Sequence, residues 1–170
     1  MAAFRRILYP VLLLLWSLSA LETVAQSEMV RERNSLRGVD GFYLSLNIEG
    51  PASAQDALDF RRLHQDLQAR LQEVGLPVWA EDRLPASERI PYLHVHINAV
   101  DAGRGLYPFS VEVRFYQAVR LARDPSATTV AATWSASIVG IASHDHLRLI
   151  PEAALGLLED FIEDFNGVNL

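Results

Sequence analysis

Four of the five histidines fall in two His-x-His pairs, His94 with His96 and His144 with His146. Residues two apart in a strand project from the same face, about 6.5–7 Å apart along the chain. Imidazoles so placed can converge on one Zn²⁺ ion. One candidate function is therefore a metal-binding protein or metallohydrolase that uses these four residues. The alternative is that they are polar occupants of an exposed sheet face, and we expect the two pairs to lie more than about 8 Å apart, beyond a shared metal site.

A second set of candidate residues combines aromatic rings with a cation. Tyr43, Tyr92, Arg114 and Tyr116 all fall on the polar side of alternating segments. Exposed aromatic residues gathered on one face are a modest signal of an interface, so these four residues form a candidate binding surface. The alternative is that the rings only cover backbone on a solvent-facing sheet.

Motifs that would indicate a specific enzyme are absent from the sequence. There is no cysteine, which excludes a thiolate nucleophile, a disulfide framework and lipid attachment through a cysteine. The sequence also has no Gly-x-Ser-x-Gly, no phosphate-binding loop and no His-Glu-x-x-His. We therefore assign no catalytic residue, expect no cofactor, and favour a protein that is not an enzyme.

The charge balance restricts the class of partner. All 15 basic residues are arginine, against 21 acidic residues, for a formal net charge of −6. An acidic chain is a poor ligand for nucleic acid or for an anionic membrane surface. We expect a protein partner in the cell envelope and no nucleic acid.

The first 25 residues are typical of a secretory signal peptide. Arg5 and Arg6 precede an apolar run over 7–19, and Thr23-Val24-Ala25 matches a cleavage site, which we place after Ala25. The run is short for a bilayer span, which needs about 20 apolar residues; an uncleaved membrane anchor is the alternative. We expect a periplasmic or secreted protein with no stable membrane insertion after cleavage. Residues 26–39 are polar and are expected to be a mobile leader, followed by a single domain over 40–170.

Hydrophobic periodicity predicts four strands and two helices in that domain. The strands alternate apolar and polar residues over 41–48, 92–99, 109–121 and 128–139. Apolar residues at helical spacing predict one helix from Ser53 or Asp56 to about Val74, and another from Pro151 to about Gly167. The predicted core is Phe42, Leu44, Leu46, Phe60, Leu67, Val95, Ile97, Val111, Val113, Trp134, Leu158, Phe161 and Ile162.

The order β-α-β-β-β-α predicts an α+β fold, a two-layer sandwich with a four-stranded mixed sheet and both helices on one face. The first two strands should be parallel through a right-handed crossover. Short links make the last three strands an antiparallel meander. The other face of the sheet should be open and carry the tyrosines, the first histidine pair and Arg114.

This order of elements over 40–169 resembles small α/β modules of exported bacterial envelope proteins, among them the amino-terminal domain of the TolB family. The resemblance lies in Gly75-Leu76-Pro77-Val78, in the strand Tyr92 to Ala99 and in the closing segment Phe161 to Asn169. It implies a module that recognises partners or assembles rather than one that catalyses. It carries over no functional residue, and the TolB β-propeller is absent. We therefore expect a non-enzymatic periplasmic binding or envelope-assembly module that acts through its open polar sheet face or an edge strand.

Overall fold

The computed structural model describes residues 29–80 and 90–170. The predicted signal peptide and its cleavage site lie outside the described residues. Within the described part, no helix is both long enough and apolar enough to cross a membrane.

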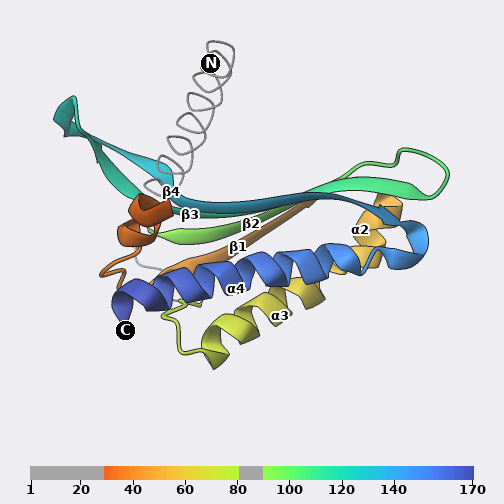
Figure 1. The fold of residues 1–170 in the computed structure, drawn as a ribbon, viewed down its shortest axis with the longest axis horizontal. Helices are drawn as coiled ribbons and strands as arrows, with labels where there is room; N and C mark the ends of the chain where they lie inside the picture. Colours follow the sequence, from red (N-terminus) through yellow and green to blue (C-terminus); the bar gives the residue numbers. More distant parts are fainter. Residues whose placement is uncertain (1–28, 81–89) are drawn as a thin grey trace, which may run out of the picture.

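The centre of the fold is one four-stranded sheet (Figure 1). Its strands are β1 (Tyr43–Glu49), β2 (Tyr92–Ala99), β3 (Leu106–Leu121) and β4 (Asp124–Ser143), in that spatial order. β1 and β2 pair in parallel, and the β2–β3 and β3–β4 pairs are antiparallel. The predicted mixed sheet is confirmed, with its parallel first pair and its antiparallel meander.

The helices form the second layer, on one side of the sheet (Figure 1). They are α2 (Ala52–Leu58), α3 (Phe60–Glu73) and α4 (Leu149–Asn169), with a single 3₁₀ turn, η2 (His144–His146), between β4 and α4. A further helical stretch covers 29–35. The predicted two-layer α+β sandwich is confirmed, although the first predicted helix consists of two.

Asp59 divides that first helix. Its φ of 39° is left-handed, which ends α2, and its side chain accepts a hydrogen bond of 3.2 Å from the Arg62 backbone N–H, which caps α3. Phe60 is therefore the first residue of α3, and it is 50% exposed, with its ring against His64. The prediction of Phe60 as a core residue was wrong, because the break places the ring outside the sheet–helix interface.

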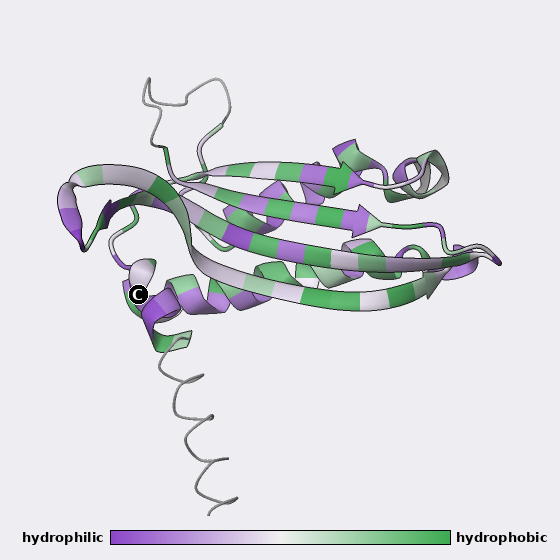
Figure 2. Cartoon of the chain, turned by 90° about the horizontal axis from the view of Figure 1, so that it is seen from above, coloured by the Kyte–Doolittle hydropathy of each residue, from purple (hydrophilic) through white to green (hydrophobic). Residues whose placement is uncertain are grey.

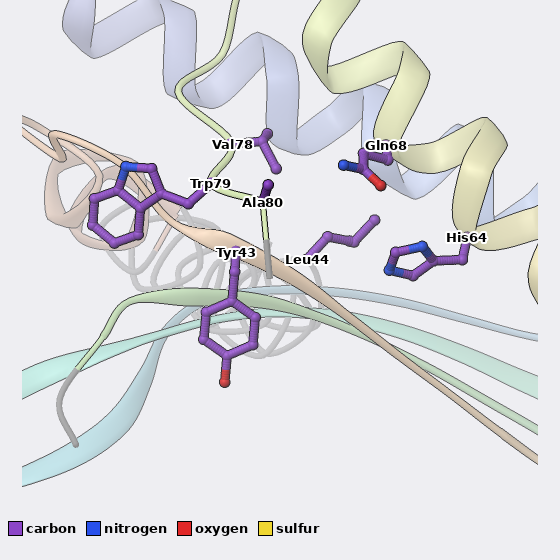
Figure 3. A pocket seen from close by; sticks show the side chains of 7 residues that line it. All are labelled: Tyr43, Leu44, His64, Gln68, Val78, Trp79 and Ala80. Atoms are coloured by element: carbon purple, nitrogen blue, oxygen red, sulfur yellow. The ribbon is translucent and has the colours of Figure 1, made fainter. Parts of the chain in front are cut away.

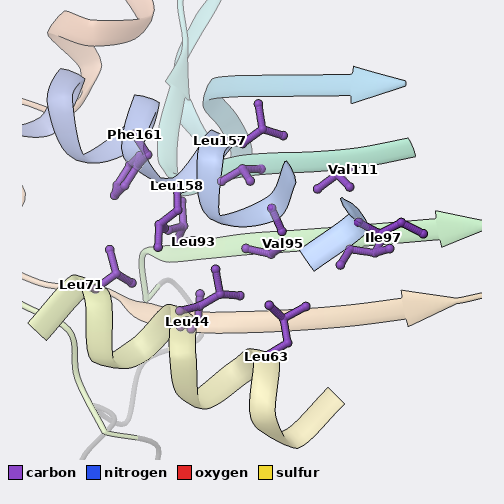
Figure 4. Packing of buried hydrophobic residues seen from close by; sticks show 14 of the residues in the cluster. Leu44, Leu63, Leu71, Leu93, Val95, Ile97, Val111, Leu157, Leu158 and Phe161 are labelled. Carbon is purple, nitrogen blue, oxygen red and sulfur yellow. The ribbon is translucent and has the colours of Figure 1, made fainter. Parts of the chain in front are cut away.

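The core lies between the sheet and the two long helices (Figure 4). Leu63, Leu67 and Leu71, four residues apart, form the buried stripe of α3. Phe161 of α4 packs against Phe42, Phe115 and Trp134, with ring centroids 5.2–5.6 Å apart. The other predicted core residues are buried, except that Leu46 is only partly buried against the cluster.

The segment before the sheet packs on the domain. Leu36 is fully buried in the core, and its carbonyl accepts a hydrogen bond of 3.0 Å from Asn169 Nδ2. Arg33 Nε donates to Asp164 Oδ1 at 2.6 Å. The described part of the leader that we expected to be mobile is thus held by α4, because a single leucine in a polar segment supplies an apolar anchor.

The β3–β4 hairpin is longer than predicted. A two-residue turn at 122–123 joins the strands, and β4 runs on to Ser143. The β2–β3 pairing ends at Tyr116, close to a register shift between Phe115 and Tyr116. Beyond that shift the hairpin continues as a two-stranded arm past β1 and β2 (Figure 1).

Candidate functional site

The face of the sheet away from α2, α3 and α4 is the candidate site. Figure 2 looks onto this face, with the helices behind the sheet and hydrophilic and hydrophobic bands alternating along the strands. The alternation follows from the strand period of two, which puts Leu93, Val95 and Ile97 in the core and their neighbours on this face. All four predicted binding residues and the first histidine pair lie here.

Three of those residues form a continuous stack. Tyr43 pairs with Tyr92, and Tyr92 pairs with Tyr116, so the three stand in one row across β1, β2 and β3. The Tyr43 and Tyr92 rings have centroids 5.2 Å apart and planes 27° apart. The Tyr92 and Tyr116 rings are 4.8 Å and 11° apart. We call this row the tyrosine ladder. Its inner ring faces are occupied by one another, so a ligand meets ring edges and phenol groups.

Arg114 flanks the tyrosine ladder, one register row away. Its Nη2 forms an ion pair with Glu112 Oε2 at 2.6 Å, and its side chain is 44% exposed. A hydrogen bond with Tyr116 and the charge of Glu112 raise the pKa of Arg114, against the effect of burial. Burial, and then the neighbouring Tyr116 and Tyr43, raise the pKa of the Tyr92 phenol. At neutral pH the face therefore presents a fixed cation beside a protonated phenol.

The first histidine pair continues the same surface along β2. The rings of His94 and His96 stack with centroids 6.1 Å apart, and His94 also lies edge-on to Tyr92 at 6.4 Å. His94 Nδ1 lies 3.2 Å from Ser45 Oγ, and His96 Nδ1 lies 3.4 Å from Asn47 Nδ2. Burial lowers the pKa of His94, and the nearby His96 and Arg114 lower it further. His94 is thus held in its neutral form.

The second histidine pair is not brought to the first. His144 and His146 lie in η2, where His146 Nδ1 is 2.8 Å from Ser143 Oγ. Across the sheet, His96 pairs with Glu112 of β3, and Glu112 pairs with Ser137 of β4. Ser137 is six residues before Ser143, a separation of roughly 20 Å along the strand. Across 29–80 and 90–170, no three His, Asp or Glu side chains are grouped to hold a metal ion.

One feature of this face escaped the sequence reasoning. On the β4 side, Val139 is 80% exposed and Ile141 is 68% exposed. Both project on the open face, because they pair with Ser110 and Pro108, which alternate with buried Phe109. The sequence does contain an indication of this apolar surface, because no charged residue occurs from Pro125 to Ser143. Two large apolar side chains therefore border a polar face.

A small pocket lies at the other edge of the sheet, between β1, α3 and the segment over 78–80 (Figure 3). Its volume is about 90 Å³, and it is lined by Tyr43, Leu44, His64, Gln68, Val78, Trp79 and Ala80. Trp79 packs tightly on Gly41, where an added Cβ would come within 2.3 Å of the indole. Among the described residues, the lining of this pocket contains no carboxylate and no arginine.

Comparison with known proteins finds matches among solved structures. No family model matches the chain, and no curated protein matches it. Among solved structures, the chain is similar to rare lipoprotein B from Shewanella oneidensis, at 15% identity and a TM-score of 0.32, over 74% of this chain and 94% of that one.

Proposed function

We propose that this protein is an exported, non-enzymatic module of the cell envelope that binds a protein partner through its open sheet face. The observation that carries the proposal is the tyrosine ladder. Tyr43, Tyr92 and Tyr116 are partly exposed, yet each ring is already fixed by its neighbour.

Pre-ordered tyrosines suit a protein interface. Tyrosine brings a large contact area and a hydroxyl group at a low cost in side-chain entropy, and it is enriched among residues that dominate binding energy. Stacking lowers that entropy cost further, since the rings are ordered before the partner arrives. The geometry favours a protein surface over a flat sugar ring or nucleobase, because the inner ring faces are already covered.

Arg114 adds polarity to the same surface. Arginine is enriched at interfaces. Because a guanidinium has five N–H donors, Arg114 can donate to a carboxylate or carbonyl of the partner while its ion pair with Glu112 remains. A partner of complementary chemistry would bring aromatic or aliphatic side chains to the tyrosine ladder and an acceptor to Arg114. Location in the periplasm or outside the cell follows from the signal peptide that the sequence predicts.

Affinity capture from an envelope extract tests the proposal. The wild-type protein is expected to retain a specific partner, and Tyr92→Ala to lose most of it. Phe60→Ala is the matched control, because Phe60 is an exposed aromatic residue on α3, in the other layer. Equal capture by all three proteins would contradict the proposal, as would turnover of a small substrate without any partner.

A further inference from the structure

β4 is an edge strand whose last part, after the bulge near Thr133, lacks the usual protection. It is the last strand in the sheet order, so within 29–80 and 90–170 one side of its backbone has no neighbouring strand. Natural edge strands are guarded by charges, prolines, bulges or a covering segment, because free strand edges pair with other chains. From Ser126 to Ser143, β4 carries neither a charge nor a proline. Figure 2 shows its long stretch of hydrophobic and neutral residues at the border of the sheet.

The opposite edge strand, β1, is shorter, with seven residues, and is protected at its two ends. β1 begins beside a bridge between Phe42 and Val78, with Trp79 N donating to Phe42 O at 2.7 Å. β1 ends on the charged residue Glu49. The contrast singles out β4.

Part of β4 is covered by the chain itself. Ser35 Oγ donates to the carbonyl of Thr133 at 3.0 Å, and Ser135 Oγ donates to Glu32 Oε1 at 3.3 Å. The helical stretch over 29–35 thus lies along the edge at 133–135. In the described part of the chain, no backbone hydrogen bond from outside the sheet reaches the outer side of β4 from Ala136 to Ala142, which we call the free segment.

The direction of the backbone groups in the free segment follows from one bond. His144 N donates to Gly105 O on the β3 side at 2.8 Å. Backbone groups alternate sides along an antiparallel strand, so Ala142, Gly140 and Ile138 also bond to β3. The N–H and C=O groups of Ser137, Val139 and Ile141 then point outward. The same three residues place their side chains on the open face.

We propose that the free segment pairs antiparallel with the free segment of a second copy of this chain, about a two-fold axis at Gly140. The strand is complementary to itself in this register. Val139 of each copy faces Ile141 of the other, so the two most exposed apolar side chains of the strand become neighbours. On the helix side, Ile138, which is 45% exposed, faces Ala142 of the other copy.

The next antiparallel register is less favourable. A two-fold axis at Val139 would place Ile141 against Ser137, an apolar side chain against a hydroxyl, and would leave only one apolar pair on the open face. Outward backbone groups face one another in both registers, so the side chains decide between them. A charge-free strand is needed for either, because like charges directly opposite destabilise a pair.

Pairing about Gly140 extends one sheet across both copies. The axis is perpendicular to the sheet, so the two open faces point the same way and the helices stay on the other side. A dimer would therefore display two tyrosine ladders on one surface. The inference does not depend on the proposed function, since the ladder lies on β1, β2 and β3.

Light scattering and sedimentation of the exported protein over a range of concentrations test the pairing. The wild-type chain is expected to dimerise. Val139→Lys and Ile141→Glu are each expected to weaken the dimer at least about tenfold, because each buries a charge against an apolar residue. Val130→Lys is the matched control, an exposed valine on the same strand outside the free segment, and should dimerise normally. A wild-type monomer at every concentration, or equal dimerisation by all four proteins, would overturn the proposal.

Mixing the two charged variants tests the register and the identity of the occupant. The Val139→Lys chain and the Ile141→Glu chain should form a heterodimer, seen by native mass spectrometry, because the introduced ammonium of one chain then faces the introduced carboxylate of the other. If a heterodimer formed instead between the Val139→Lys and Val139→Glu chains, the proposed register would be overturned. If neither mixture formed a heterodimer, self-pairing itself would be overturned.

A proline variant tests whether the backbone itself makes the contact. Val139→Pro removes only an outward N–H and should abolish the dimer with an unchanged circular dichroism spectrum. A dimer that persists in this variant would overturn backbone pairing.

Discussion

The ring of Tyr92 lies parallel to the ring of Tyr116, with an interplanar angle of 11° and centroids 4.8 Å apart. Tyr92 stacks on Tyr43 from its other side, so it is the middle member of a row that crosses three strands. Stacked rings on a solvent-facing sheet hold each other in place. The proposed binding surface is therefore ordered before any partner arrives.

Mutations of Tyr92 should distinguish the contribution of its hydroxyl group to partner binding from that of its ring. Tyr92→Phe keeps the stack and is expected to weaken partner capture only slightly, by about 1 kcal/mol or less, the typical worth of a neutral hydrogen bond. Tyr92→Ala removes the support of both neighbours and should cost about 2 kcal/mol or more, roughly a 30-fold loss of affinity, as for dominant interface residues. Titration of the captured partner on immobilised variants would measure both; equal losses would show that the stack does not matter.

Asp164 should be a stability determinant that joins three segments. It accepts hydrogen bonds from Arg33 Nε at 2.6 Å and from Trp134 Nε1 at 2.9 Å. Asp164→Ala leaves the largely buried indole N–H unpaired and releases the stretch over 29–35, so we expect a loss of about 1–3 kcal/mol in the free energy of unfolding. Asp160→Ala, one turn earlier and exposed, is the control. Urea titration followed by tryptophan fluorescence measures the difference, and equal stability of the two variants would refute the role of Asp164.

Phe161 should be among the most costly residues to truncate. It is fully buried, and it contacts Phe42, Phe115 and Trp134. Phe161→Ala is expected to destabilise the fold by about 3–5 kcal/mol, since it opens a cavity that rigid aromatic neighbours cannot fill. Phe60→Ala should change stability by less than about 1 kcal/mol, because its ring is half exposed. Denaturant midpoints of the two variants test this, and a larger loss for Phe60→Ala would contradict the packing described.

Stability should fall in mild acid because of His94. Its pKa is lowered in the folded protein, first by burial and then by His96 and Arg114, from an ordinary value of 6.5. The unfolded chain then binds more protons than the folded one, so the free energy of unfolding decreases as the pH falls below about 6.5. Once the pH is below the pKa of His94 in the folded protein, this residue causes no further decrease in the free energy of unfolding. His94→Gln should show a shallower decrease in unfolding free energy between about pH 7 and 5; an identical pH profile would assign the effect elsewhere.

Part of the tyrosine ladder could be predicted from the sequence. Alternation placed Tyr43, Tyr92 and Tyr116 on one face, because a strand has a period of two. The Tyr92–Tyr116 pairing could also have been predicted, since Gly103 and Gly105 mark a turn centred on Arg104, and Tyr92 and Tyr116 are equidistant from it. The Tyr43–Tyr92 pairing could not, because a helix and a long connection separate β1 from β2 and no local turn sets their register.

Other features depended on tertiary contacts that no periodicity reveals. The helical pattern runs through Asp59 without interruption, yet a left-handed residue breaks the helix there. Leu36 looked like an isolated apolar residue in a charged segment, and its burial depends on bonds to α4 that are distant in sequence. The exposure of Val139 and Ile141 follows from the position of β4 at the edge of the sheet, and strand order was not determined by the sequence alone.

The most direct test of the proposed binding function is photo-crosslinking in living cells from the open sheet face. A photoreactive amino acid at position 118 replaces an exposed alanine two residues after Tyr116 on β3, on the same face, and leaves Arg114 and all three rings in place. The same group at position 60 reports on the helix layer. We expect one discrete envelope-protein adduct from position 118 and none from position 60. No adduct from position 118, or the same adducts from both positions, would contradict a partner bound at the open face.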